Sequence, residues 1–508
     1  MKKKNYTFFI ATMCLTMSLA SCEFFENIGI SANSDFSYSF NESESIDSNA
    51  NYYKGKISDT HYSINKHSVY QKNTPFPVGD MKILVIPVVI KGYEKNASGK
   101  TKDRIEKTFF GDSSDTAWES VASYYYKSSY GKLKISGTVT DWFECGLTPK
   151  QVYEKNNADY GDLGTYYILN QAYQFAKNQG IDMTEYDLDK DGYVDSIWLV
   201  YSCPDSVAIQ GVSDEDNPFW AFTFWDYTNV NKKNKNNPVP NTYAWASYSF
   251  MNNMNDLMVS KNDAHTFIHE TGHILGLDDY YDTTNIHHPL GCLDMMDYNV
   301  GDHCAFSKYS LGWTSPYVVT GETTIELAPF ESSGQCILIK NPNKKFNESA
   351  FDEYLMLELL TPTGLWKQDA TEKYQNQFLT YTKPGIRITH VDARLIKYNT
   401  KTFVSSSSDG NVDLAYSNTP SRSYSEGTET LRDDLIAIIP KNRNTDFQTT
   451  NYVYATNESL FTTGDSFSFD EYNQFFRNKK FHDGSSFPYF ISFENVSNSG
   501  ATITFTIL

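Results

Sequence analysis

Residues 81–90 read MKILVIPVVI, a run in which nearly every side chain is apolar and most are β-branched. Such a run is typical of a strand that is covered on both faces. Residues 196–201, SIWLVY, predict a second buried strand. Weaker periodic patterns predict helices at 116–127 and 166–178 and strands at 134–140 and 243–251. Strands and helices in this order indicate one mixed α/β or α+β domain, which we place at residues 79–314.

The chain changes character after Trp313. Short strand-like runs follow at 323–327, 354–360, 386–391 and 501–507. They predict a second, β-rich domain over residues 315–508, with a sandwich-like arrangement. The fold class that we expect is therefore α+β, in which a mixed first domain is followed by a β-rich C-terminal domain.

The N-terminus predicts export. Three lysines and a short apolar stretch precede the segment Leu19-Ala20-Ser21-Cys22, as in a secretory signal peptide over residues 1–21. The segment also resembles a bacterial lipobox, which implies a lipid-modified Cys22. An ordinary signal peptide with a fortuitous cysteine is the alternative. Residues 22–78 are polar and predict a lipidated tether or a short pro-segment, and the sequence does not separate the two.

The charge of the chain argues against nucleic acid as a partner. The full chain carries 43 basic and 62 acidic residues and a formal charge of -19. Residues 1–21 contain three lysines and no acids, so their removal gives -19 - 3 = -22. A surface of that charge repels nucleic acid and anionic lipid. We expect a monomeric lipoprotein of the cell envelope or cell surface, on the extracellular side and attached to the membrane only through Cys22.

The cysteines do not form a disulfide framework. Beyond the signal segment and Cys22 they are widely spaced and odd in number: Cys145, Cys203, Cys292, Cys304 and Cys336. No C-x-x-C pair is present. Cys292 and Cys304 could pair across a short loop, and buried free thiols are the alternative. Any bound metal must therefore use histidine and carboxylate ligands.

Residues 269–273 read HETGH. Residues four apart lie on the same face of a helix, so His269 and His273 can present two imidazoles to one ion, with Glu270 beside them. Imidazole is a good zinc ligand, and a carboxylate can take a proton from a metal-activated water. A fortuitous pair on a surface helix is the competing interpretation. Gly276 could end the helix, and Asp279 follows three residues later.

The spacing from His269 through Gly276 to Asp279 resembles the extended metzincin signature, in the variant whose third ligand is aspartate. The wider chain is similar to the immune inhibitor A family of secreted bacterial zinc peptidases. The likeness extends over most of residues 81–400, and its other segments are 129–133, 187–195, 280–282, 294–297, 301–303, Lys308, 311–313 and 385–392. The resemblance implies a metzincin-like zinc peptidase domain in the first half of the chain.

The resemblance also implies roles for single residues. Asp279 would be the third zinc ligand, with the adjacent Asp278 as an alternative. Met296 would form the Met-turn beneath the metal, and Tyr298 would help to stabilise the oxyanion, a role for which His303 is a rival. A thermolysin-like site would need a glutamate ligand on a later helix. No glutamate lies between Glu270 and Glu322, and the segment around Glu322 predicts a turn and a strand.

Residues 187–195 read DLDKDGYVD and place carboxylates at alternate positions with a glycine at the sharp turn. This spacing can surround a hard cation with oxygen ligands, and it predicts a structural calcium site. The predicted ligands are Asp187, Asp189, Asp191, Tyr193 through its carbonyl, and Asp195. The twelfth position is Trp198 instead of glutamate, so the loop departs from an EF-hand. An acidic surface turn is the alternative.

These patterns support three hypotheses of different classes. The first is an endopeptidase for extracellular peptides or proteins, with zinc on His269, His273 and Asp279, Glu270 as general base and Tyr298 at the oxyanion. The second is a surface-anchored binding lipoprotein whose metal is structural or inactive. The third, a metal-dependent hydrolase of another bond, has no positive support in the sequence.

Overall fold

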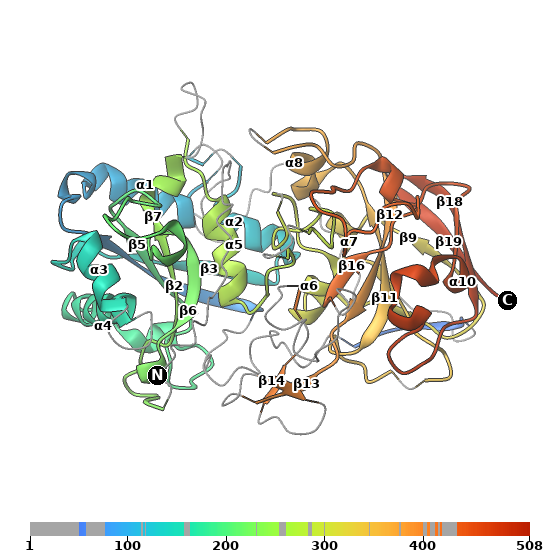
Figure 1. Cartoon of the computed structure of the whole chain (residues 1–508), viewed down its shortest axis with the longest axis horizontal. Coiled ribbons are helices and arrows are strands. Elements are labelled where there is room, and N and C mark those ends of the chain that lie inside the picture. The colour runs from blue at the N-terminus through green and yellow to red at the C-terminus, as the bar shows by residue number, and fades with distance from the viewer. Residues whose placement is uncertain are drawn as a thin grey trace.

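The structure is a computed structural model of the chain. It describes residues 50–56, 77–112, 115–116, 118–156, 163–229, 231–252, 261–282, 287–298, 300–344, 346–374, 377–399, 404–406, 412–414, 417–418 and 434–508. The predicted signal peptide and Cys22 lie outside the described residues. Helices and strands of the first half and strands of the second half form two bodies that lie side by side (Figure 1).

The first half is built on one mostly parallel sheet. Its strands run in the order β3-β2-β5-β7-β6, and β4 also pairs with β2. All pairings are parallel except that of β6 with β7. The bounds are β2 Gly79–Val89, β3 Leu133–Val139, β4 Phe143–Glu144, β5 Ile197–Tyr201, β6 Phe222–Trp225 and β7 Thr242–Ser247. This arrangement has α/β character, because continuous apolar strands suit a sheet that is buried on both faces.

Helices cover both faces of this sheet. The side chains of Ile83, Val85 and Trp198 pack into the same core as α1 (Gly99–Phe110), α2 (Val121–Ser128) and α5 (His265–Ile274). The alternate side chains of the strands, including Leu84 and Ile86, pack against α3 (Pro149–Asn156) and α4 (Leu163–Asn178). The burial of residues 81–90 and 196–201 on both faces is thus confirmed.

Two elements of the first half begin or end at residues that differ from the predicted ones. The helix predicted at 116–127 begins only at Val121, because Ser120 and Ser123 form a capping box at that point. The strand predicted at 243–251 ends at Ser247 and continues as a 3-10 helix over Tyr248–Asn252. Propensity alone does not locate such boundaries, whereas a cap or a turn fixes them.

The second half contains two packed sheets. One has the strand order β1-β8-β10-β11-β12-β16 and the other is the antiparallel sheet β17-β18-β19-β9. The bounds are β1 Tyr52–Lys54, β8 Tyr317–Val319, β9 Thr323–Leu327, β10 Cys336–Ile339, β11 Glu353–Leu360, β12 Gly385–Asp392, β16 Ile436–Ile438, β17 Ser466–Ser468, β18 Tyr489–Ser497 and β19 Gly500–Ile507. Short strands β13 Ile396–Asn399, β14 Val404–Ser406 and β15 Val412–Leu414 form a separate sheet, and the helices are α6 Ala305–Ser310, α7 Phe330–Ser333, α8 Lys367–Ala370 and α10 Phe469–Tyr472.

The six-stranded sheet joins the two halves of the molecule. Because side chains alternate along a strand, Leu355 and Leu357 face the antiparallel sheet and share its core. Met356 and Val391 point to the opposite face, where they belong to the same core as α2 and α5. The β-rich C-terminal part is therefore confirmed, and its first sheet also packs directly onto the first half of the chain. The domain boundary near residue 314 stays a prediction.

Residues 52–54 form a strand within the segment predicted to be a tether or a short pro-segment. This strand, β1, pairs with β8 at the edge of the six-stranded sheet, and the role of the segment stays a prediction. The aromatic ring of Tyr52 packs edge-on against Tyr317 with 5.6 Å between ring centroids. The ring contact of Tyr52 and the three residue pairs between β1 and β8 hold this edge strand, although the residues around it in the sequence are mostly polar.

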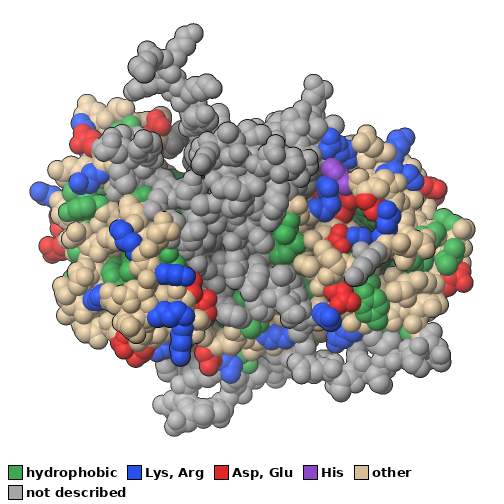
Figure 2. Space-filling model, turned by 90° about the horizontal axis from the view of Figure 1, so that it is seen from below, with side chains coloured by type: hydrophobic (Ala, Val, Ile, Leu, Met, Phe, Trp, Pro, Cys, Tyr) green, Lys and Arg blue, Asp and Glu red, His purple; other side chains and the backbone are tan. Residues whose placement is uncertain are grey.

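On the face seen in Figure 2, acidic and basic side chains both occur on each half. The expectation that nucleic acid is not a partner stays a prediction. Within the described residues, none of the helices has the length and apolar character needed to cross a membrane.

Candidate active site

Helix α5 carries the HETGH segment and is held against the sheet by its apolar side. Phe267 packs on Phe109 and Trp198, with ring centroids 5.5 and 5.4 Å away. The hydroxyl of Tyr125, on α2, donates to the carbonyl of Ile268 at 2.7 Å. The helix ends at Ile274, and Gly276 has φ +97°. This left-handed conformation favours glycine and turns the chain back toward the helix.

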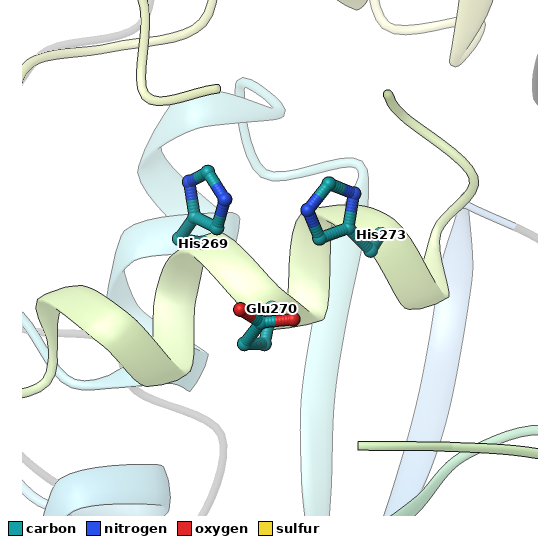
Figure 3. A group of neighbouring side chains, drawn as sticks. All are labelled: His269, Glu270 and His273. Carbon is teal, nitrogen blue, oxygen red and sulfur yellow. The ribbon is translucent and has the colours of Figure 1, made fainter. Parts of the chain in front are cut away.

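The turn brings Asp279 to both histidines. Its Oδ1 lies 3.1 Å from Nε2 of His269 and 3.2 Å from Nε2 of His273. Figure 3 shows the two imidazoles projecting to the same side of α5. Ligand atoms that each bind one zinc ion at about 2.0–2.2 Å in a tetrahedral arrangement lie about 3.3 Å apart. Both distances from Asp279 Oδ1 to the imidazole nitrogens are close to this spacing, so the residues fit a zinc ion.

The other ring nitrogens fix the orientation of the imidazoles. His269 Nδ1 lies 2.9 Å from the carbonyl oxygen of Met295, and His273 Nδ1 lies 3.0 Å from that of Leu277. A carbonyl only accepts hydrogen bonds, so Nδ1 carries the proton in both rings. Nε2 of each ring is therefore left as the atom that can bind a metal, which is the tautomer that a metal ligand needs.

The charges of the site depend on one another. Burial alone lowers the pKa of His273, but the carboxylate of Asp279 outweighs this effect and raises the pKa to about 10. Burial raises the pKa of Asp279, and the two imidazoles outweigh it and hold that pKa well below its usual range. Without a metal, protons on the imidazoles neutralise the buried carboxylate. A divalent cation can replace these protons, which is the electrostatic requirement for a metal site.

Glu270 lies on the same turn of α5, and its side chain is within 4.8 Å of the ligand atoms of both histidines. It is 5 % exposed, and burial raises its pKa. The hydroxyl of Thr223, on the edge strand β6, lies 3.1 Å from Glu270 Oε2 and 2.9 Å from the Glu270 carbonyl oxygen. The carboxylate is thus oriented beside the two imidazoles, as a proton acceptor in the site must be.

Met296 lies directly beneath α5. A Cβ atom added to Gly272 would be 2.6 Å from the sulfur of Met296, so the helix and the methionine touch at the glycine. The carbonyl of Met296 accepts from the backbone N–H of Tyr280 at 2.8 Å, one residue after Asp279. Asp294 accepts from the backbone N–H of Met296 at 2.7 Å. The methionine therefore packs against α5 at Gly272, and its role as a Met-turn residue stays a prediction.

This contact predicts that Gly272→Ala destabilises the protein by about 1–3 kcal/mol, because an extra methyl group in a packed core forces the sulfur or the helix to move. Gly99→Ala is the matched control, since Gly99 is also helical and a Cβ there meets no atom within 4 Å. Thermal unfolding of both variants checks the prediction. Equal melting temperatures for the two variants would contradict the contact.

Tyr298 and His303, the two residues considered for the oxyanion, have different surroundings. The ring of Tyr298 lies 5.1 Å from that of His288 and stacks on Phe378 at 6.1 Å, and its role stays a prediction. His303 is fully buried, with Nδ1 3.5 Å from Asp294 Oδ1. A buried imidazole cannot contact a substrate, so the structure disfavours His303 as the rival. Asp278 accepts a hydrogen bond from Ser417 at 2.6 Å.

The Asp-rich loop folds around its own carboxylates. Asp187, Asp189 and Asp195 have side-chain oxygens within 4.8 Å of one another. Burial raises the pKa of Asp195 to about 8 and that of Asp191 to about 6. Gly192 has φ +97°, and a Cβ there would lie 2.7 Å from the backbone nitrogen of Asn234. Only glycine suits this turn.

The carbonyl of Tyr193, the fifth predicted ligand of the loop, belongs to a residue that forms an isolated parallel bridge with Val239. The backbone N–H of Asp195 donates to the carbonyl of Tyr186 at 2.7 Å. The loop is therefore bonded to the segment before β7 and to the turn that precedes the loop.

All five cysteines after residue 22 are free, and Cys292 and Cys304 are both buried. The pairing of Cys292 with Cys304 is therefore wrong for this structure, and the alternative of buried thiols holds.

Comparison with known proteins gives the family of this domain. Residues 100–299 match the family model described as immune inhibitor A peptidase M6, catalytic domain. The match includes the HETGH helix, Asp279 and Met296. No curated protein matches the chain significantly. M6 peptidases are zinc-dependent endopeptidases and are typically secreted. Residues 100–299 therefore form a catalytic domain of the immune inhibitor A, M6 peptidase family, and the chain is a metalloendopeptidase.

Proposed function

We propose that the chain cleaves extracellular peptides or proteins internally, with zinc held by His269, His273 and Asp279 and with Glu270 as the general base. One observation carries the proposal. A single oxygen of Asp279 lies within 3.2 Å of Nε2 of both histidines, while each Nδ1 is held by a backbone carbonyl. Three ligand atoms would thus lie on one side of the zinc ion, and a fourth coordination position would stay open for water or substrate.

The residues of the chain have separate tasks in this proposal. When bound, zinc would supply Lewis acidity, which polarises a carbonyl and makes a water more acidic. Glu270 accepts the proton of the attacking water at a carboxylate oxygen and later delivers it to the leaving amine. Its raised pKa suits both transfers, because a base must also be able to release the proton. Thr223 holds the carboxylate in place, and Tyr298 is proposed to donate to the oxyanion.

Metal content and proteolysis measured on the same sample test this proposal. Purified residues 23–508 should contain about one zinc per catalytic site and should digest a peptide library. A zinc chelator should abolish the digestion, and added zinc should restore it. A metal-free sample that digests the library at the same rate would contradict the proposal. Capture of a ligand with no cleavage would favour a binding lipoprotein instead.

We also propose that the loop at 187–195 binds calcium for stability. Support comes from the cluster of three carboxylates, of which two are buried, and from the turn that only glycine suits. Carboxylates in such a cluster repel one another when ionised, and a divalent cation relieves the repulsion. Calcium there would hold the start of β5 against the turn at Tyr186, far along the chain from the HETGH helix.

Calcium should therefore stabilise the protein most at high pH. The raised pKa of Asp195 means that the calcium-free fold binds a proton there that the unfolded chain has lost, so stability falls as pH rises from about 4 to about 8. Calcium at 100 times its Kd should add about 2.7 kcal/mol. Asp195→Asn should remove the calcium effect and weaken the pH dependence, whereas Asp182→Asn, at an exposed aspartate nearby, should change neither. Melting curves at pH 5 and 8 check this, and a calcium effect that persists in Asp195→Asn would contradict the site.

Export and lipid attachment at Cys22 are proposed on the basis of the N-terminal sequence alone. They agree with the typical secretion of M6 peptidases. The mass of the N-terminal peptide from the mature protein tests them: an acylated Cys22 is expected, and an unmodified N-terminus elsewhere would contradict the lipid anchor.

A further inference from the structure

The stretch from Leu293 to Ala305 forms the floor of the active site. We call its described residues, 293–298 and 300–305, the floor segment. The Met295 carbonyl accepts from His269 Nδ1, and the Met296 side chain touches α5 at Gly272. The position of this segment therefore decides where the imidazole of His269 lies.

Two charged side chains of the second half contact the floor segment from one face of the six-stranded sheet. Glu358 on β11 and Arg387 on β12 are directly opposite each other in the strand register. Their neighbours Leu357 and Ile388 face the antiparallel sheet, so strand alternation directs Glu358 and Arg387 toward the catalytic half. Both are essentially fully buried.

Their hydrogen bonds run to the two ends of the floor segment. Arg387 donates from Nη1 to the carbonyl of Leu293 and from Nε to Glu358 Oε1 at 3.0 Å. Glu358 Oε1 also accepts from the backbone N–H of Ala305 at 3.3 Å. The guanidinium lies over the Trp366 ring, 5.2 Å from its centroid. One buried ion pair thus connects both ends of the floor segment to the second half.

A third buried ionisable side chain holds the middle of the same segment. Asp369, on α8, accepts from the backbone N–H of Val300 at 3.0 Å through Oδ1 and from that of Gly301 at 2.9 Å through Oδ2. A Cβ on Gly301 would lie 2.2 Å from Asp369 Oδ2. The carboxylate is therefore in close contact with the backbone, and a substituent at Gly301 would displace it.

The contacts of Glu358, Arg387 and Asp369 attach the second half to the first and also fix the position of the floor segment. Apolar packing would attach the second half without the desolvation cost of the buried ion pair between Glu358 and Arg387, which is several kcal/mol for each ion. Apolar packing has no preferred direction, whereas a polar side chain that is hydrogen-bonded to a backbone N–H or carbonyl fixes the position of that backbone group. Glu358, Arg387 and Asp369 make such bonds to one short segment, and they fix the position of the active-site floor.

We propose that Arg387, Glu358 and Asp369 are positioning residues of the active site, so that the C-terminal half completes the catalytic centre through the floor segment. The proposal rests on the proposed zinc site, because it acts through the hydrogen bond between Met295 and His269. Groups that orient a metal ligand typically change activity or metal affinity by about 10- to 100-fold when altered.

The chain offers a matched control on the same two strands. The buried carboxylate of Glu353 on β11 lies 3.1 Å from Nε2 of His390 on β12. Glu353 lies on the face of the sheet that also carries Leu355 and Leu357, away from the floor segment. Glu358→Gln and Glu353→Gln therefore each remove one buried charge from β11, and only the first touches the floor.

The experiment compares these variants and Asp369→Asn in the mature chain, residues 23–508. Wild type must first bind zinc and cleave casein, and failure there would reject the proposed function itself. We expect Glu358→Gln and Asp369→Asn to lower kcat about 10- to 100-fold with little change in KM, and to shift the visible spectrum of the cobalt-substituted site. Glu353→Gln should lose comparable thermal stability but keep kcat and the spectrum. Arg387→Lys, which keeps the charge, should retain more kcat than Arg387→Met.

Equal kcat and an unchanged cobalt spectrum in Glu358→Gln and Asp369→Asn, with wild type active, would overturn the proposal. So would an equal loss of kcat in Glu353→Gln, because the effect would then follow general stability. If Glu358→Gln does not fold, Asp369→Asn decides by the same two readouts, since it replaces a carboxylate with a group of the same shape.

Discussion

Glu270→Gln should bind zinc as wild type does and lose nearly all hydrolysis of casein. The amide has the shape of the carboxylate and can still contact Thr223, so the site should keep its geometry. It cannot accept a proton, however, and general base catalysis contributes about 10²- to 10⁴-fold to the rate. We expect kcat to fall within this range while the zinc content stays at the wild-type level.

Glu106→Gln is the control for the change of charge, because Glu106 is an exposed residue of α1. It should leave kcat and zinc content unchanged. Wild-type kcat in Glu270→Gln would show that the base is another group. Loss of zinc from Glu270→Gln would show that Glu270 is a ligand instead of the base. Metal analysis and initial rates on the same preparation separate these outcomes.

Asp279→Asn should lose both zinc and activity, which is the second large effect. The carboxylate lies between the two imidazoles and supplies the negative charge that attracts the ion. An amide oxygen is a weaker and neutral ligand. We expect zinc affinity to fall by more than about 100-fold, which exceeds the usual effect of a residue that only orients a ligand.

The neighbouring aspartate gives the matched control. Asp278 contacts Ser417, so Asp278→Asn should keep zinc and activity within a few-fold of wild type. Titration of the metal-free variants with zinc in the presence of a competing chelator measures both affinities. If Asp278→Asn loses zinc and Asp279→Asn keeps it, the third ligand has been assigned to the wrong neighbour.

The local features of the site could be read from the sequence because they depend on spacing within one helix and one turn. Residues four apart share a helix face whatever the rest of the fold does. Gly276 can adopt its positive φ in any context. Local patterns also located six strands close to their predicted places. These strands were predicted at 81–90, 196–201, 323–327, 354–360, 386–391 and 501–507.

The three-dimensional structure alone brought together residues that are distant in the sequence. Thr223 reaches Glu270 from an edge strand, and Tyr125 holds α5 from another helix. Neither residue carries a motif. The edge strand β1, within a polar segment, forms only because β8 offers free backbone partners. Pairing of this kind depends on the neighbours of a strand as much as on its own composition.

The sequence by itself determined the helix that carries the proposed zinc ligands, the class of its chemistry and the order of the mixed and β-rich parts, because these follow from short-range periodicity and ligand spacing. Only the tertiary structure decided that the second half contacts the active-site floor through Arg387, Glu358 and Asp369. Those contacts join residues roughly 50 to 100 positions apart, and a buried charge finds its partner by the packing of whole sheets. No local pattern records that geometry.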